Sequence, residues 1–108
     1  MNKAFIRLLP LAVRQTSAIF LERGQQLAAI AKVFAEQPHE RSAHIAIDDA
    51  IPVEEIAQEL FDLTNHPSRQ DEREEKYGTG PSLSVGDAVT VIGHGTWVCL
   101  SVGWAKVP

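Results

Sequence analysis

Apolar side chains recur with helical spacing in the middle of the chain. Counted from residue 53, they stand at positions i, i+3, i+4, i+7, i+8 and i+11, which share one face of a helix. These positions are Val53, Ile56, Ala57, Leu60, Phe61 and Thr64. Pro52, directly before them, is well tolerated where a helix begins. The pattern predicts an amphipathic helix from residue 52 that buries this face.

The N-terminal third carries two further helical stripes. One runs through residues 4–23, with Pro10 accepted in its first turn, and the other through residues 25–37, which Pro38 ends. The stripes consist of Phe5, Leu9, Ala12, Thr16 and Ile19, and of Leu27, Ile30, Ala31 and Phe34. The spacing favours a helix in both places. Residues 3–9 also fit a strand, and that alternative stays open.

Strand patterns follow in the second half of the chain. Residues 43–47 predict a short strand, and residues 83–91 with 97–104 predict a β-hairpin that reverses at Gly93–Gly95. Alternation along the return strand divides its side chains between two faces. The set expected to face the core is Val98, Leu100, Val102 and Trp104. Trp97 belongs to the other face, where its ring would be either exposed to a partner or packed against the N-terminal helix.

A polar segment, residues 65–81, separates the middle helix from the hairpin. It contains almost no apolar side chain, which is typical of a long loop, and a short helical turn is expected around residues 70–77. A chain of 108 residues suffices for one domain with one modest core. We therefore expect a single α+β domain, residues 1–108. It would have a small three-stranded sheet with a C-terminal β-hairpin packed against two or three helices.

Charge is unevenly distributed along the chain, whose formal net charge is −4. Residues 48–75 carry ten acidic and two basic side chains, whereas residues 1–47 carry six basic and three acidic ones. An acidic middle disfavours general binding to phosphate backbones and suits a protein partner with a basic surface. Arg7 interrupts the apolar start too early for a signal peptide, and no run of about 18 apolar residues predicts a membrane span. We expect a cytoplasmic protein.

The residue types of common catalytic and metal sites do not occur with the required spacing. The four histidines are His39, His44, His66 and His94, and no two have the spacing of a metal-binding helix. The single cysteine, Cys99, excludes a disulfide scaffold within a monomer and lies in a strand pattern, where an inert thiol is expected. We predict no catalytic, cofactor-binding or metal-binding residue, and hence no cofactor.

A set of polar residues flanks the long loop: Asn65, His66, Ser82, Ser84 and Asp87. In an enzymatic interpretation, Asp87 would orient His66 as a general base. A scaffold interpretation is favoured. Asn65 would end the helix in the left-handed conformation, and His66 would be extended because Pro67 follows it. The two serines and Asp87 would then fix turns.

Three segments, in this order, resemble a known family. They are residues 61–67 (Phe-Asp-Leu-Thr-Asn-His-Pro), residues 82–89 (Ser-Leu-Ser-Val-Gly-Asp-Ala-Val) and residues 101–104 (Ser-Val-Gly-Trp). The succession is similar to the YodL-like domain of small bacterial proteins from plasmids, phages and integrated elements, over about residues 53–106. The resemblance implies a mobile-element setting and no known reaction or cofactor. A scaffold role is expected for its motif positions Asn65, His66, Ser82, Ser84, Gly86, Asp87, Gly103 and Trp104.

These features favour a non-enzymatic accessory protein of a mobile genetic element. It would bind a basic protein partner through an acidic surface, against a host defence or regulatory complex. The predicted contact residues are Glu55, Glu59, Asp62, Asp71, Glu72, Glu74, Glu75 and Trp97. The alternative is a DNA-binding or transcription-regulating protein that uses Lys3, Arg7 and Arg14 from one helix face. Homodimer formation stays open.

Overall fold

The computed structural model describes residues 1–8, 40–100 and 103–107. The helix expected over residues 25–37 lies outside the described residues, as does the part of the first expected helix beyond residue 8. Arg14, which the DNA-binding alternative uses, also lies outside them.

The chain begins with a strand, β1 (Asn2–Leu8). Burial alternates along it with a period of two. Ala4, Ile6 and Leu8 are buried, while Lys3, Phe5 and Arg7 point to the other face. The helix expected from residue 4 is therefore wrong for residues 4–8, and the strand left open for residues 3–9 is the observed structure. A segment this short fits both the helical and the strand repeat of apolar positions. The strand forms because β1 pairs its backbone hydrogen-bonding groups with strands on both of its edges.

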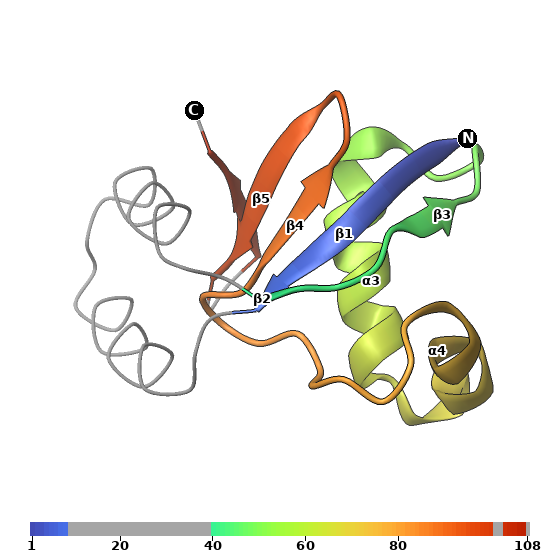
Figure 1. Cartoon of the computed structure of the whole chain (residues 1–108). Helices are drawn as coiled ribbons and strands as arrows, with labels where there is room; N and C mark the ends of the chain where they lie inside the picture. The colour runs from blue at the N-terminus through green and yellow to red at the C-terminus, as the bar shows by residue number, and fades with distance from the viewer. Residues whose placement is uncertain (9–39, 101–102, 108) are drawn as a thin grey trace.

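The described residues form one antiparallel sheet of six strands, in the order β2-β1-β4-β5-β6, with β3 also paired to β1 (Figure 1). The other strands are β2 (Glu40–Arg41), β3 (Ile45–Ile47), β4 (Ala88–Val91), β5 (Gly95–Cys99) and β6 (Trp104–Lys106). The α+β class is confirmed, but the expected three-stranded sheet is too small. Strands of two and three residues, such as β2 and β6, are too short to show alternation in a sequence.

The predicted reversal of the hairpin is confirmed between β4 and β5. Gly93 and Gly95 both have positive φ, 83° and 140°, which side chains with a Cβ atom rarely adopt. The N–H of His94 donates to the carbonyl of Val91 at 2.9 Å and closes the turn. The hairpin is shorter than expected, because β4 begins only at Ala88.

Trp97 corrects the expected division of faces in β5. Its ring is buried, with 7% exposure, and it belongs to the same core cluster as Ile6 and Val89. The return strand ends at Cys99, and Gly103, with φ of 78°, turns the chain into a new strand. Trp104 thus lies opposite Cys99, on the same face as Trp97. The expectation of an exposed Trp97 fails because both faces of β5 are buried, and Val98, on the face opposite Trp97, is fully buried as well.

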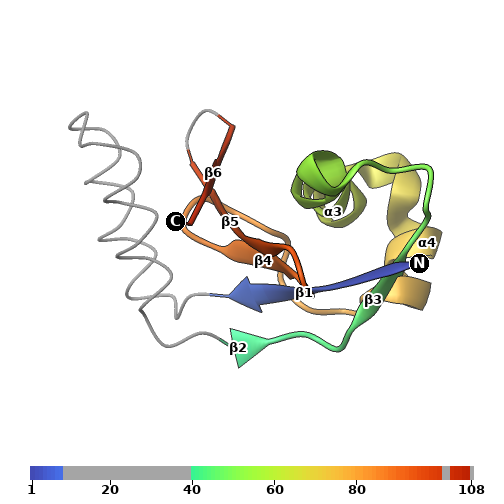
Figure 2. The same cartoon turned by 90° about the horizontal axis from the view of Figure 1, so that it is seen from above.

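The helical elements form the second layer. They are η1 (Val53–Glu55), α3 (Ile56–Asn65), η2 (Pro67–Arg69) and α4 (Gln70–Lys76). Figure 2 shows α3 over one face of the sheet, with α4 beside it. The predicted middle helix and the helical turn within residues 65–81 are both confirmed. Ile56, Leu60 and Leu63 of α3 pack against the buried side chains of β1 and β4, and this contact is the centre of the core.

Candidate functional site

Six of the ten acidic residues of the middle segment lie on α3 and α4, which we call the acidic helix pair. The chain passes from one helix to the other through an extended His66, with φ of −82° and ψ of 121°, before Pro67. This is the conformation that a following proline favours. The His66 Nδ1 atom lies 2.7 Å from the Ser68 hydroxyl oxygen, and the Ser68 N–H points to the same nitrogen. His66 therefore caps the turn that sets α4 beside α3.

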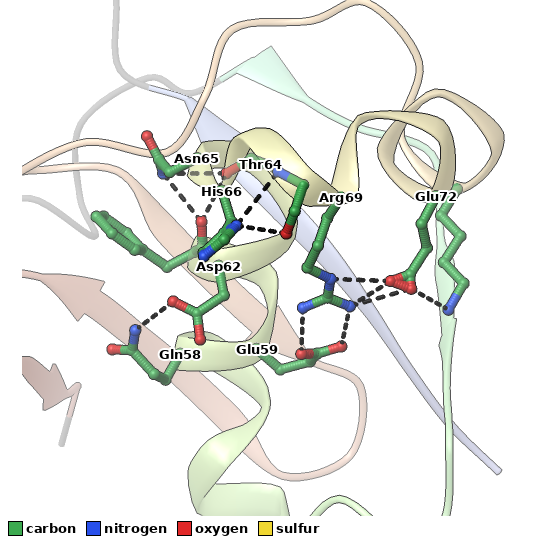
Figure 3. A network of polar contacts seen from close by, with 11 residues as sticks. Gln58, Glu59, Asp62, Thr64, Asn65, His66, Arg69 and Glu72 are labelled. Atoms are coloured by element: carbon green, nitrogen blue, oxygen red, sulfur yellow. Dashed lines mark hydrogen bonds and ion pairs between the residues drawn. The ribbon is translucent and has the colours of Figure 1, made fainter.

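Arg69 ties the two helices together. Its guanidinium donates to both carboxylate oxygens of Glu59, at 2.7 and 2.9 Å, and to the carboxylate of Glu72 (Figure 3). Lys76 adds a longer contact to Glu72, at 3.8 Å. Hydrogen bonds from Arg69 lower the pKa of Glu72 and raise the pKa of Arg69. Two of the predicted contact carboxylates are thus neutralised within the molecule.

The remaining acidic side chains of the helix pair face the solvent, as does Glu55 of η1, directly before α3. Glu55, Asp62, Asp71, Glu74 and Glu75 are exposed, and none of them makes an ion pair with a residue that the structure describes. Asp62 accepts a hydrogen bond from Gln58, and Glu74 accepts one from Gln70. These two contacts leave the carboxylate charges uncompensated. Of the seven carboxylates predicted to contact a partner, these five are exposed without a described ion pair, whereas Glu59 and Glu72 are held by Arg69.

Arg73 lies within the acidic run and is nevertheless buried, with 9% exposure. Its guanidinium donates to the carbonyl oxygens of Thr64, Gly78 and Gly80, and lies 5.2 Å from the centre of the Tyr77 ring. The side chain therefore anchors the loop after α4 to the end of α3. Sequence reasoning missed this role, because an arginine between acidic residues has the pattern of a surface charge.

The polar set around the loop separates into two groups in space. In the first, the Asn65 side-chain amide donates to the carbonyls of Phe61 and Leu83, both at 3.0 Å, and the Ser82 hydroxyl donates to the Thr64 carbonyl at 2.6 Å. These bonds join the end of α3 to the segment before β4. Asn65 ends the helix through its side chain, and the expected left-handed backbone is wrong, since no described residue other than glycine has positive φ.

The second group surrounds Asp87, whose side chain is fully buried. Its carboxylate accepts from the N–H and the hydroxyl of Ser84, at 3.0 and 3.2 Å. Gly86 occupies the third position of the same turn with φ of 93°. Both arrangements bind backbone groups at turns and helix ends, which is the chemistry of a scaffold.

Gly103 turns the chain into β6, and the Trp104 indole N–H donates to Gln58 of α3 at 3.1 Å.

The described residues hold no metal site and no activated thiol. No group of three or more histidine, cysteine or acidic side chains among them is arranged to hold an ion. Burial, followed by the charge of Asp87, raises the pKa of Cys99 to about 11. The thiol is therefore protonated at neutral pH and a poor nucleophile.

Comparisons with known proteins add no identification. No family model, no curated protein and no solved structure matches the chain. Among the described residues, no helix is long and apolar enough to cross a membrane.

Proposed function

We propose that this chain is a non-enzymatic binding protein that contacts a basic protein partner through the exposed carboxylates of the acidic helix pair. The observation that carries the proposal is the group of five carboxylates without a described cation. Four of them lie on two helices held in fixed orientation by Arg69 and Arg73, and the fifth, Glu55, ends η1 directly before α3. Uncompensated charge on a rigid surface steers a partner of opposite charge and selects among partners.

The proposed contact set differs from the one expected from the sequence. Trp97 is buried in the sheet, so the contact set is Glu55, Asp62, Asp71, Glu74 and Glu75. Glu59 and Glu72 serve the partner surface by fixing α4 against α3, through Arg69. As part of the same proposal, the protein is a cytoplasmic accessory of a mobile element that acts on a host defence or regulatory complex. That part follows from the family resemblance of the motif segments.

The test is affinity capture from lysate of the source organism, with a matched pair of charge reversals. One variant carries Asp71→Lys and Glu75→Lys on α4. The control carries Glu40→Lys and Asp49→Lys, two exposed acids outside the helix pair, so both variants have the same net charge. The proposal expects a basic protein that binds the wild type and the control, is lost from the α4 variant, and dissociates as salt rises. A partner retained by the α4 variant would contradict it.

A further inference from the structure

The sheet face turned away from α3 carries basic and aromatic side chains. We call it the basic sheet face and define it by Lys3, Phe5, Arg7, Arg41 and His44. Because Ala4, Ile6 and Leu8 point into the core, alternation turns Lys3, Phe5 and Arg7 to the opposite side. The face lies on the far side of the sheet from α3 (Figure 2).

Planar groups stack at the centre of this face. The ring of His44 lies over the half-buried ring of Phe5, with the ring centres 5.7 Å apart and the planes 21° apart. The guanidinium carbon of Arg41 lies 5.1 Å from the centre of the Phe5 ring. Both His44 and Arg41 are exposed. Imidazole and guanidinium planes that are held in place by an aromatic ring and open to solvent are surfaces on which nucleic-acid bases stack.

Positive charge is concentrated around the stack. Arg41 of β2 stands directly opposite Arg7 of β1, on the same face of the sheet. Lys3, further along β1 on the same face, is exposed. Glu40 stands opposite Leu8 and belongs to the other face of the sheet. The face therefore offers cations at both ends of an aromatic centre.

Hydroxyl and apolar groups extend the face across the sheet. Phe5 is in register with Thr90 of β4, and Thr90 with Thr96 of β5. The two threonine hydroxyl oxygens lie 2.8 Å apart. The N–H of Ile92 donates to the carbonyl of Lys3, and the Ile92 side chain is 43% exposed. The result is a surface with stacking, hydrogen-bonding and cationic groups in neighbouring rows.

We propose that the basic sheet face binds single-stranded nucleic acid. Unpaired bases stack on His44 and Arg41, and phosphates contact the charges of Lys3 and Arg41. Charge complementarity selects an anionic polymer, and the exposed planar groups select one whose bases are free, since a duplex keeps its bases stacked inside. The site uses none of the residues of the acidic helix pair, so it is independent of the proposed protein partner.

The test measures fluorescence anisotropy of labelled fifteen-nucleotide oligothymidine and oligouridine with the whole chain. Two phosphate contacts on a single strand give a salt dependence that weakens binding about sevenfold between 50 and 200 mM salt. A labelled duplex of the same length is expected to bind at least tenfold more weakly. A base-free polyphosphate and vesicles containing phosphatidylglycerol are the competitors.

Three variants locate the site. Phe5→Leu removes the aromatic ring but keeps an apolar side chain, and is expected to weaken binding about tenfold. Phe5→Tyr keeps the ring and is expected to bind within about twofold of the wild type. Lys106→Gln removes an exposed cation that lies over Trp97 on the other face, and serves as the control for charge alone. A thermal unfolding curve of each variant shows whether it is folded.

Each outcome decides for or against the proposal. Weak binding by folded Phe5→Leu, with wild-type binding by Phe5→Tyr and Lys106→Gln, supports it. Equal binding by Phe5→Leu, duplex binding as tight as single-strand binding, or full displacement by polyphosphate at equal charge would overturn the stacking site. Binding to the vesicles alone would assign the face to an anionic lipid surface and also overturn the proposal. None of these results bears on the Asp71 and Glu75 variant.

Discussion

The acidic helix pair and the basic sheet face differ in how far their arginine side chains are engaged in contacts within the protein. On the acidic helix pair, Arg69 and Arg73 are surrounded by carboxylates in the sequence, yet both are engaged inside the protein. On the basic sheet face, the cationic ends of Lys3 and Arg41 reach the solvent. The helix pair is thus more acidic outward than its composition suggests, and the sheet face is basic although the chain is acidic. Net charge does not describe either surface.

Different periods produce this separation. The helix repeat brings residues three and four apart together, so Glu72 meets both Arg69 and Lys76 on α4. The strand repeat of two places Lys3, Phe5 and Arg7 on one face, and none of these three positions is acidic. On α4, the helical spacing therefore brings carboxylates next to cations of the same helix. On β1, the strand spacing brings two basic side chains, Lys3 and Arg7, to the same face.

The largest effect is expected from Arg73→Met, which removes the guanidinium that anchors the loop after α4 to the end of α3. The substitution removes the donor of the half-buried Gly78 and Gly80 carbonyls and one of the two donors to the Thr64 carbonyl, which also accepts from Ser82. We expect a loss of about 3 kcal/mol in the free energy of unfolding, measured by urea denaturation followed by circular dichroism. Arg73→Lys keeps the charge and is expected to recover part of the loss. A loss below about 1 kcal/mol for Arg73→Met would show that water replaces the guanidinium.

The next effect comes from Arg69→Gln, which frees the charges of Glu59 and Glu72. The pair is about one-quarter to one-third exposed, so the bidentate contact is worth about 1 kcal/mol at pH 7. Because the folded pKa of Glu72 lies below its ordinary value of 4.5, the share of this stability that comes from Glu72 is present above pH 4.5 and is lost as pH falls through the folded pKa. Urea denaturation at a series of pH values should show the wild type and Arg69→Gln converging below pH 4.5. A constant difference down to pH 3 would contradict the assigned cause.

The helix of residues 56–65 and the hairpin turn were predictable because their signals are local and strong. The apolar stripe of α3 spans three turns, and the glycines at Gly93 and Gly95 mark the positive φ values of the reversal. The polar segment after α3 gave only a weak helical signal, since α4 is short and buries a single side chain, Arg73. Its stability comes from contacts with distant backbone groups.

The candidate surfaces were less predictable, because they depend on pairing between distant residues. Arg69 and Glu59 are ten positions apart, and the contact requires the turn at His66 to be known first. The stack of Phe5 joins residues from the two ends of a long chain segment. Alternating basic and aromatic positions at Lys3, Phe5 and Arg7 were the available signal, and the competing helical spacing hid it.

The smallest effect sharpens the difference between two acids on one helix. Glu75→Gln removes an exposed charge without a described cation, so we expect a change below about 0.5 kcal/mol in the free energy of unfolding. Glu72→Gln, three residues earlier, removes a carboxylate that accepts from Arg69, and we expect a loss of about 1 kcal/mol. The same urea curves measure both variants. Equal losses would mean that Arg69 holds Glu72 no more firmly than solvent does. A larger loss in the free energy of unfolding for Glu72→Gln than for Glu75→Gln would mean that Glu72 holds the two helices together, whereas Glu75 is available to a partner.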